Sequence, residues 1–357
     1  MNMARSSEFL SRLGISHPII QAPMAGVSTP TMAAAVSNAG ALGSLGLGAD
    51  TVESAARAIE ATRALTDRPL HLNVFCHRPA VSDTGIEQAW LTRLASEFAR
   101  YHATPPVRLR EIYTSFLADP GMLGLLLETK PEIVSFHFGL PPRLVIEALR
   151  QAGIILVASA TNFVEAKIIA DAGLDAVIAQ GYEAGGHRGM FDPDSRDDRL
   201  GTFALTRMLA ATLEIPVIAA GGIMDGAGIA AALKLGAAAA QLGTAFVACP
   251  ESSADTGYRA ALAGHAAHHT AMTRAISGRP ARCLANKFTA LGESVSPAEI
   301  PAYPIAYDAG KSLHAAAKAR GEYGFGAQWA GQGAPLSRAL PARELVEILV
   351  RELAETN

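Results

Sequence analysis

The residue best suited to chemistry in this sequence is His187, in the segment Gln180-Gly-Tyr-Glu-Ala-Gly-Gly-His-Arg-Gly189. Four glycines in ten residues leave room for a flat ligand against the backbone, because they carry no side chains. An imidazole beside that ligand can accept or donate a proton near neutral pH. A single histidine is more often structural, but a glycine-rich loop directly after an apolar run favours a catalytic role for His187.

Two further loops have the composition of a phosphate site. Ala220-Gly221-Gly222-Ile223 and Gln241-Leu-Gly243-Thr244 each end an apolar run. Glycines let backbone N–H groups approach an anion, and the Thr244 hydroxyl adds a donor. A tight turn would explain either loop alone, but the two together favour phosphate binding.

A third glycine motif, Gly226-Ala-Gly228-Ile-Ala-Ala231, matches the dinucleotide-binding pattern G-x-G-x-x-A. That pattern belongs after the first strand of a doubly wound sheet. Here six strand–helix units precede the motif and no second half of such a sheet follows it. We therefore interpret it as an ordinary helix start.

Polar side chains at the ends of other apolar runs extend the candidate site. Asn73 and Gln180 each end an apolar run, and an amide can read both donors and acceptors on the edge of a ring. His137 ends another apolar run. Its position is equally compatible with lining a pocket and with packing in the core. The histidines of His265-Ala-Ala-His-His269 have a helical spacing that can bind metal, but no HExxH pattern or carboxylate accompanies them. We expect that segment to face solvent and predict no metal site.

Eight apolar runs have the right character to position these loops. Most are continuously apolar, as is typical of strands in a parallel sheet that is covered on both faces. The predicted strands are Pro18–Met24, Ala41–Leu47, Leu70–Phe75, Ile133–Gly139, Ile155–Ala160, Ala176–Tyr182, Pro216–Gly222 and Ala238–Val247.

Helical patterns separate these runs. Four of the helices end at an apolar residue followed by glycine, which can take the left-handed conformation that closes a helix. These joints are Ala39-Gly40, Ala152-Gly153, Ala172-Gly173 and Leu235-Gly236. Eight strands with recurrent helix–glycine–strand joints predict an α/β fold, a (β/α)8 TIM barrel.

Two long stretches interrupt the barrel pattern. Residues 76–109, with a predicted helix at Ile86–Ala99, follow the third strand, and residues 249–329 follow the eighth. Both begin at the carboxyl end of a strand, where barrel active sites form. We interpret them together as a smaller inserted substrate or lid domain, with residues 1–75, 110–248 and 330–357 forming the barrel.

Bulk composition excludes several classes of protein. A net charge of -3 gives no basic surface for nucleic acid or for an anionic membrane. Three widely spaced cysteines form neither a disulfide framework nor a metal-binding pair. The first residues lack the apolar stretch of a signal peptide, and proline and glycine interrupt the uncharged residues 18–49. We therefore expect a cytoplasmic enzyme with a large core.

Several of these motifs, in this order, resemble those of class I nitronate monooxygenase, formerly called 2-nitropropane dioxygenase. The resemblance spans residues 18–333. Besides the His187 loop, the matching motifs are Gln21-Ala-Pro-Met24-Ala-Gly, His71-Leu-Asn73-Val-Phe75, Val134-Ser-Phe-His-Phe-Gly139-Leu-Pro141, Ala219-Ala-Gly-Gly-Ile-Met-Asp225, Gln241-Leu-Gly-Thr-Ala-Phe246 and Trp329-Ala-Gly-Gln332-Gly333.

The resemblance implies an activity and a cofactor. Enzymes of this family bind FMN without a covalent bond and oxidise alkyl nitronates, such as propionate 3-nitronate, with O2. The products are an aldehyde or semialdehyde and nitrite or nitrate, and NAD(P)H is not required. Besides the nitronate and O2 we expect no nucleic acid or membrane partner, and a monomer or homodimer.

By motif position, the resemblance also assigns residues. His187 should stand over the reactive flavin ring. Tyr303, Tyr307 and Lys311, spaced by four, should bind substrate from one face of a helix, and we add His137 to this group. Without the resemblance, an ordinary amphipathic helix would explain that spacing. The residues expected to contact FMN are Ala22, Pro23, Met24, Asn73, Gln180, Gly185, Gly186, Gly221, Gly222, Gln241, Gly243, Thr244 and Gln332.

Two other enzyme classes share part of this pattern. An FMN-dependent NAD(P)H reductase of enoyl-thioesters or quinones would use the same glycine loops. A flavin-free phosphosugar isomerase or lyase would use the phosphate site, but no lysine or carboxylate pair for that chemistry stands at the strand ends. The segment from Tyr303 to Lys311 and the His187 loop favour the oxidation of nitronates.

Overall fold

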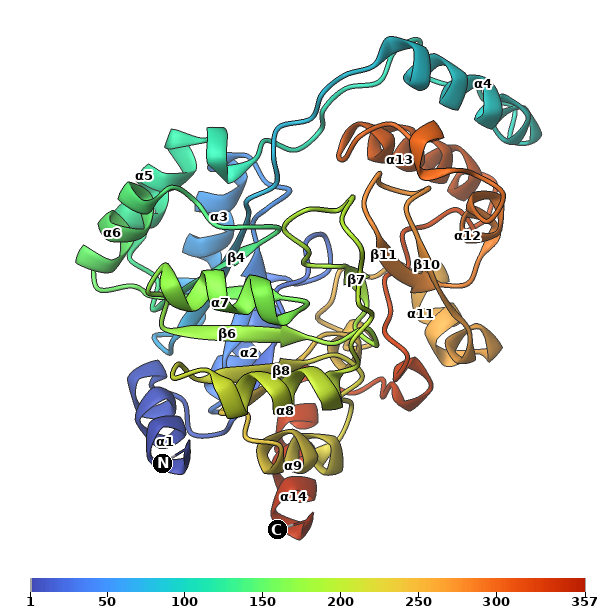
Figure 1. Cartoon of the computed structure of the whole chain (residues 1–357). Coiled ribbons are helices and arrows are strands. Elements are labelled where there is room, and N and C mark those ends of the chain that lie inside the picture. Colours follow the sequence, from blue (N-terminus) through green and yellow to red (C-terminus); the bar gives the residue numbers. More distant parts are fainter. Residues whose placement is uncertain (1, 357) are drawn as a thin grey trace.

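Eight parallel strands form a closed barrel in the computed structural model, which describes residues 2–356 (Figure 1). The sheet order is β1-β9-β8-β6-β5-β4-β3-β2. A bridge between Ile20 and Leu42 closes the barrel, since the Leu42 N–H donates to the Ile19 carbonyl at 3.0 Å. This confirms the predicted barrel. Its strands are β1 (Ile19–Gln21), β2 (Gly43–Gly46), β3 (Leu70–Phe75), β4 (Ile133–His137), β5 (Ile155–Ala160), β6 (Ala176–Gln180), β8 (Val217–Ala220) and β9 (Ala239–Leu242).

Helices cover the outside of the barrel, as expected for parallel strands buried on both faces. The glycines predicted to close four of them lie in the left-handed region, with φ of 84° at Gly40, 85° at Gly153, 75° at Gly173 and 104° at Gly236. No helix within residues 2–356 has the length and apolarity needed to cross a membrane. The outer helices are α2 (Pro30–Asn38), α3 (Val52–Arg63), α6 (Arg143–Gln151), α7 (Phe163–Asp171), α8 (Thr202–Thr212), α9 (Gly226–Lys234) and α14 (Ala342–Thr356).

The prediction for the eighth strand was wrong at its carboxyl end. The strand β9 stops at Leu242, and a short helix, α10 (Thr244–Val247), follows Gly243. All four residues of α10 are buried, and an uninterrupted apolar run does not distinguish a short buried helix from a strand. The helix therefore begins at the loop predicted to bind phosphate.

Among the α-helices that were not predicted from the sequence, two more lie outside the inserted stretches. The first, α1 (Asn2–Leu13), places Phe9 and Leu13 in one cluster with Ile20 and Leu42 of the barrel interior. The second, α5 (Pro120–Thr129), follows β3 and precedes β4 in the chain. Because α1 packs against the amino ends of the strands, the open end of the barrel is the carboxyl end.

A second group of elements lies beyond that open end, where Figure 1 shows α4 beside α13. Its core joins Trp90 and Phe98 of α4 to Phe288, Leu313 and Phe325. The elements are α4 (Thr84–Arg100), α11 (Thr256–Ala263), β10 (Thr270–Thr273), β11 (Ala281–Leu284), α12 (Lys287–Gly292) and α13 (Ile305–Lys318). The 3-10 helices of the chain are η1 (Phe116–Ala118), η2 (His265–His268), η3 (Pro297–Glu299) and η4 (Ala334–Leu336).

A two-residue strand connects the barrel to this second group. β7 (Gly186–His187) follows β6 in the chain, yet it pairs antiparallel with β11 in the sheet β10-β11-β7. His187 lies opposite Ala281, and Gly186 lies opposite Arg282. The histidine singled out from the sequence is therefore positioned by a strand almost a hundred residues further along the chain.

Candidate active site

One large cavity opens at the carboxyl ends of the barrel strands. The space within it, including solvent at its open mouth, is about 1290 Å³. Sixteen of the residues predicted for the site line it. They are Ala22, Pro23, Met24, Asn73, His137, Gln180, Gly185, Gly186, His187, Gly221, Gly222, Gln241, Gly243, Thr244, Tyr303 and Tyr307.

Two predicted residues do not line the cavity. The exposed Lys311 places its ammonium nitrogen 4.9 Å from the ring centre of Tyr113 and 5.3 Å from that of Tyr307. The side chain of Gln332 is also exposed, while its backbone N–H donates to the Glu183 carbonyl at 2.9 Å. The glycines on either side of Gln332 line the cavity instead. A ligand at that point would contact the backbone of these glycines and not the Gln332 amide.

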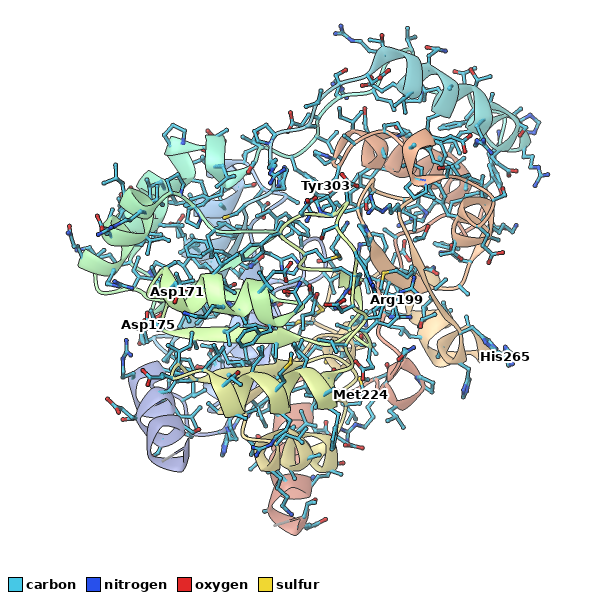
Figure 2. All side chains as sticks on the ribbon, viewed as in Figure 1. Asp171, Asp175, Arg199, Met224, His265 and Tyr303 are labelled. Carbon is cyan, nitrogen blue, oxygen red and sulfur yellow. The ribbon has the colours of Figure 1, made fainter. Side chains whose placement is uncertain are left out.

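The tyrosines reach the cavity from two different kinds of structure. Tyr307 lies on α13, but Tyr303 precedes the helix, so the expectation that it shares a helical face with Lys311 was wrong. Both rings nevertheless approach the His187 ring, with centroid distances of 5.4 Å for Tyr303 and 6.3 Å for Tyr307. Figure 2 shows Tyr303 between the barrel and the second group of elements.

The loops after β8 and β9 form a cradle of backbone and hydroxyl groups. Gly221 and Gly222 have φ of 122° and 71°, a conformation that disfavours any other residue. The Thr244 hydroxyl accepts a hydrogen bond from the Gly331 N–H at 2.9 Å, so its own proton is free to donate into the cavity. These groups suit an anion such as phosphate.

Gly243 differs from the other glycines of the cradle, because the surrounding protein leaves room for a side chain there. A Cβ atom would lie 3.5 Å from the Ala22 Cβ and 3.8 Å from the Met24 sulfur, which are ordinary contacts. Its φ of -105° suits any residue. Neither packing nor backbone conformation requires glycine here, but a ligand in the cavity would.

Two amides present unsatisfied acceptors. The Asn73 side-chain nitrogen donates to the Ser135 hydroxyl at 2.8 Å, which leaves the Asn73 oxygen for the cavity. The Gln241 side-chain oxygen is buried without a partner among the described residues. A buried acceptor without a donor is costly, so a ligand with N–H groups on its ring fits this wall.

The Gln180 amide is engaged with the His187 loop. Its nitrogen donates to the His187 carbonyl at 2.9 Å, and its oxygen accepts from the Gly189 N–H at 2.7 Å. The buried Arg188 supports the same loop through both Asp197 oxygens, at 2.9 and 3.0 Å. Gln180 therefore fixes the histidine loop as well as lining the cavity.

His187 presents one ring nitrogen to the cavity. Its Nε2 lies 2.8 Å from the Ser277 hydroxyl, and Nδ1 is the nitrogen left open. Burial, with smaller contributions from the nearby His137, Arg279 and His77, lowers the pKa of His187 to about 3. The imidazole is therefore neutral at ordinary pH and can accept a proton.

His137 holds the backbone of His187. Because a carbonyl only accepts, the His137 Nε2 must donate to the His187 oxygen, 3.2 Å away, and Nδ1 accepts from the Ser159 hydroxyl at 3.0 Å. Burial lowers the pKa of His137 to about 4. This side chain both lines the cavity and supports the loop.

The family model for nitronate monooxygenase matches residues 7–352 of the chain. The chain belongs to the nitronate monooxygenase family. Two relatives named nitronate monooxygenase cover nearly the whole sequence. The one from Paraburkholderia phytofirmans is 66% identical over 97% of this chain and 95% of its own length. The one from Pseudomonas aeruginosa is 55% identical over 98% of this chain and 99% of its own.

Solved structures share the fold. A nitroalkane oxidase from Streptomyces ansochromogenes superposes with a TM-score of 0.90 at 42% identity, covering 97% of this chain and 98% of that one. FabK from Thermotoga maritima gives a TM-score of 0.75 at 31% identity, covering 98% and 96%. By both measures this nitronate monooxygenase family member is more similar to the nitroalkane oxidase.

Sequence reasoning did not assign several residues of this family member's site. The Trp329 ring lies 5.0 Å from that of His187; it belonged to a matching motif but received no role. Tyr113 lines the cavity from a loop without any periodic pattern, and no local signal identifies it. Ser277 is a serine within an insertion, and only the fold brings it to His187. The exposed His265 lies far from Tyr303 at the edge of the molecule in Figure 2, as expected for its segment.

We expect this family member to lose stability in mild acid. Burial lowers the pKa of His71 and His187 to about 3, and of His77 and His137 to about 4. An unfolded histidine has a pKa of about 6.5, so the unfolded chain binds more protons below that pH. The stability from these neutral rings is present above about pH 6.5 and is lost as the pH falls towards 3 to 4. Urea unfolding at a series of pH values measures this loss.

A single substitution distinguishes the contribution of a histidine to this loss of stability from that of the carboxylates. Burial is the main cause of the low pKa of His77, and a hydrogen bond with the Tyr113 backbone opposes it weakly, so His77→Phe removes one titrating group and at most that one bond. The variant should lose free energy of unfolding less steeply below pH 6.5, by up to about 1.4 kcal/mol per pH unit. The same slope in both proteins would contradict the assignment of acid lability to His77.

Proposed function

We propose that this chain is an FMN-dependent enzyme that oxidises alkyl nitronates, such as propionate 3-nitronate, with O2. The products are an aldehyde or semialdehyde and nitrite or nitrate, and no NAD(P)H is consumed. The observation that carries this proposal is one cavity that joins the cradle at Gly222 and Thr244 to the neutral imidazole of His187. Membership of the nitronate monooxygenase family supports the substrate class.

FMN suits the donors and acceptors of this cavity. Its phosphate would lie at the cradle, where the Thr244 proton is free, and the one N–H of its oxidised ring would meet the side-chain oxygen of Asn73 or Gln241. Gly243 would keep the space for the ligand open. Bound there, FMN supplies the ring that accepts electrons from the substrate.

The protein side chains would bind and orient the nitronate. The Ser277 hydroxyl can donate to or accept from the His187 Nε2. Nδ1 can therefore carry the proton that binds a nitronate oxygen, or stand free to accept a proton from a neutral nitroalkane. Tyr303, Tyr307 and Trp329 surround the imidazole with rings and limit the access of water. The Lys311 ammonium lies outside this ring wall, where it would attract the anion.

We also propose the division of labour between the two parts of the chain. Residues 76–109 and 249–329 would form the substrate domain, and the rest of the chain the barrel that binds FMN. In support, Trp90 and Phe98 share a core with Phe288 and Leu313, and β7 carries His187 onto the sheet of the second part.

Turnover of propionate 3-nitronate under air, without NAD(P)H, tests the function. The expected result is O2 uptake with release of nitrite or nitrate. The purified protein should also show flavin absorption, which would exclude the flavin-free phosphosugar isomerase or lyase. Anaerobic mixing separates the reductase alternative: a flavin reduced by NADPH and not by nitronate would overturn the proposal.

A further inference from the structure

A positive charge without an ionic partner lies one layer behind the cavity wall. Arg279 is 4% exposed, and no carboxylate of the described residues pairs with it. Its Nη2 donates to the Met190 carbonyl, and its Nε has no partner. Burying a charge without a counter-ion is costly, and folding alone gives no reason to retain an arginine here.

An aromatic ring separates this charge from the cavity. The guanidinium carbon lies 4.2 Å from the ring centre of Phe138. The same ring lies 5.7 Å from the His187 ring and 5.5 Å from the Tyr303 ring. The guanidinium carbon is therefore no more than about 10 Å from either side chain. Phe138 takes a left-handed backbone, with φ of 73°, which is unusual for a residue other than glycine.

The carboxylates of Asp194 and Glu165 act on Arg279, but neither is among the groups that act on the His187 imidazole. The titratable and charged groups that act on His187 or contact its ring come from the ends of β3 and β4, from the segment before β11, and from α13 with the segment before it. These groups are His77, His137, Arg279, Tyr303 and Tyr307. All except Arg279 are neutral at ordinary pH, so the field at the imidazole is positive.

We propose that Arg279 is a positioning residue that makes the cavity selective for anions, so that a nitronate binds in preference to the neutral nitroalkane. The identity of the anion as a nitronate rests on the proposed function, whereas the preference for negative charge does not. Arg279 acts through space, because it does not line the cavity. A unit charge at about 10 Å, with an effective dielectric constant of about 20, changes the affinity for a monovalent anion by about tenfold.

Arginine substitutions test this proposal with nitrate, a planar and unreactive anion. Its dissociation constant is measured on the flavin-loaded protein from the change in flavin absorption. Arg279→Met should weaken nitrate binding about tenfold, whereas Arg279→Lys, which keeps the charge, should stay within about threefold of the original protein. The matched control is Arg274→Met, because Arg274 lies in the same segment but forms an ion pair with Asp194 at 2.8 Å. This control should bind nitrate as the original protein does.

Steady-state kinetics give a second readout. In Arg279→Met the KM for ethylnitronate should rise about tenfold, while kcat/KM for neutral nitroethane changes less than threefold. A merely structural role would not shift the ratio of the two substrates.

Three results would overturn the proposal. Nitrate could bind equally well to Arg279→Met and to the original protein. Arg279→Lys could lose as much affinity as Arg279→Met, which would assign the effect to shape. Arg274→Met could weaken nitrate binding as strongly as Arg279→Met does. Failure of the proposed function is a separate observation, namely that the original protein does not oxidise nitronates, and the nitrate measurement needs no turnover.

Discussion

Replacing His187 with asparagine should lower kcat/KM for neutral nitroethane by about 1000-fold and that for ethylnitronate only by about tenfold. A neutral nitroalkane must lose a proton from carbon, and the open Nδ1 of His187 is the acceptor that the cavity offers. The nitronate has already lost that proton, so only a hydrogen bond to its oxygens is lost. Initial rates of O2 uptake with the two substrates measure the difference.

The two substrates control for each other, because a general defect of the variant lowers both rates together. Equal losses would contradict the assignment of His187 as a base and leave it as a hydrogen-bonding group. Asparagine is too short to reach the Ser277 hydroxyl that Nε2 contacts, so the variant should also lose about 1 kcal/mol of unfolding free energy with that hydrogen bond.

Placing a carboxylate at Gly243 should abolish cofactor binding. In Gly243→Asp the new side chain points towards Ala22 and Met24, which line the cavity. A carboxylate about 4 Å from a phosphate charge costs about 4 kcal/mol at an effective dielectric constant of 20. We therefore expect FMN affinity to fall by more than about 100-fold. Titration of the flavin-free protein with FMN measures the change.

Gly243→Asn is the matched control, with the same size and no charge. It should bind FMN much more tightly than Gly243→Asp, and both variants should unfold at similar urea concentrations, because a side chain at this position meets only ordinary contacts. If the aspartate and asparagine variants bound FMN equally, the phosphate would not lie beside Gly243.

Local sequence patterns were sufficient to predict the barrel and most of the cavity wall. A buried parallel strand is an apolar run, and a helix followed directly by a strand needs a left-handed residue, so Gly40 and Gly236 mark such joints in the sequence. Residues at the carboxyl ends of such strands must meet at one end of the barrel. That rule brings Asn73, Gly222 and Thr244 together without any knowledge of distances.

Patterns of that kind do not describe contacts made across the chain. Ser277 and Arg279 lie in an insertion, and only the pairing of β7 with β11 brings their segment to His187. Tyr113 enters the cavity from an irregular loop. The hydrogen bonds between the Gln180 amide and the His187 loop also depend on the fold and not on a local spacing of residues.

The pairing of β7 with β11 has a consequence for how such enzymes can diversify. TIM barrels support many chemistries by variation of the loops at the carboxyl ends of their strands. Here the backbone of His187 is held on one side by Gln180 of the barrel and on the other by β11 of the insertion. An exchange of the insertion would also remove the strand that orients the imidazole. New substrate ranges are therefore more accessible through point changes around Tyr303 and Tyr307 than through recombination of whole domains.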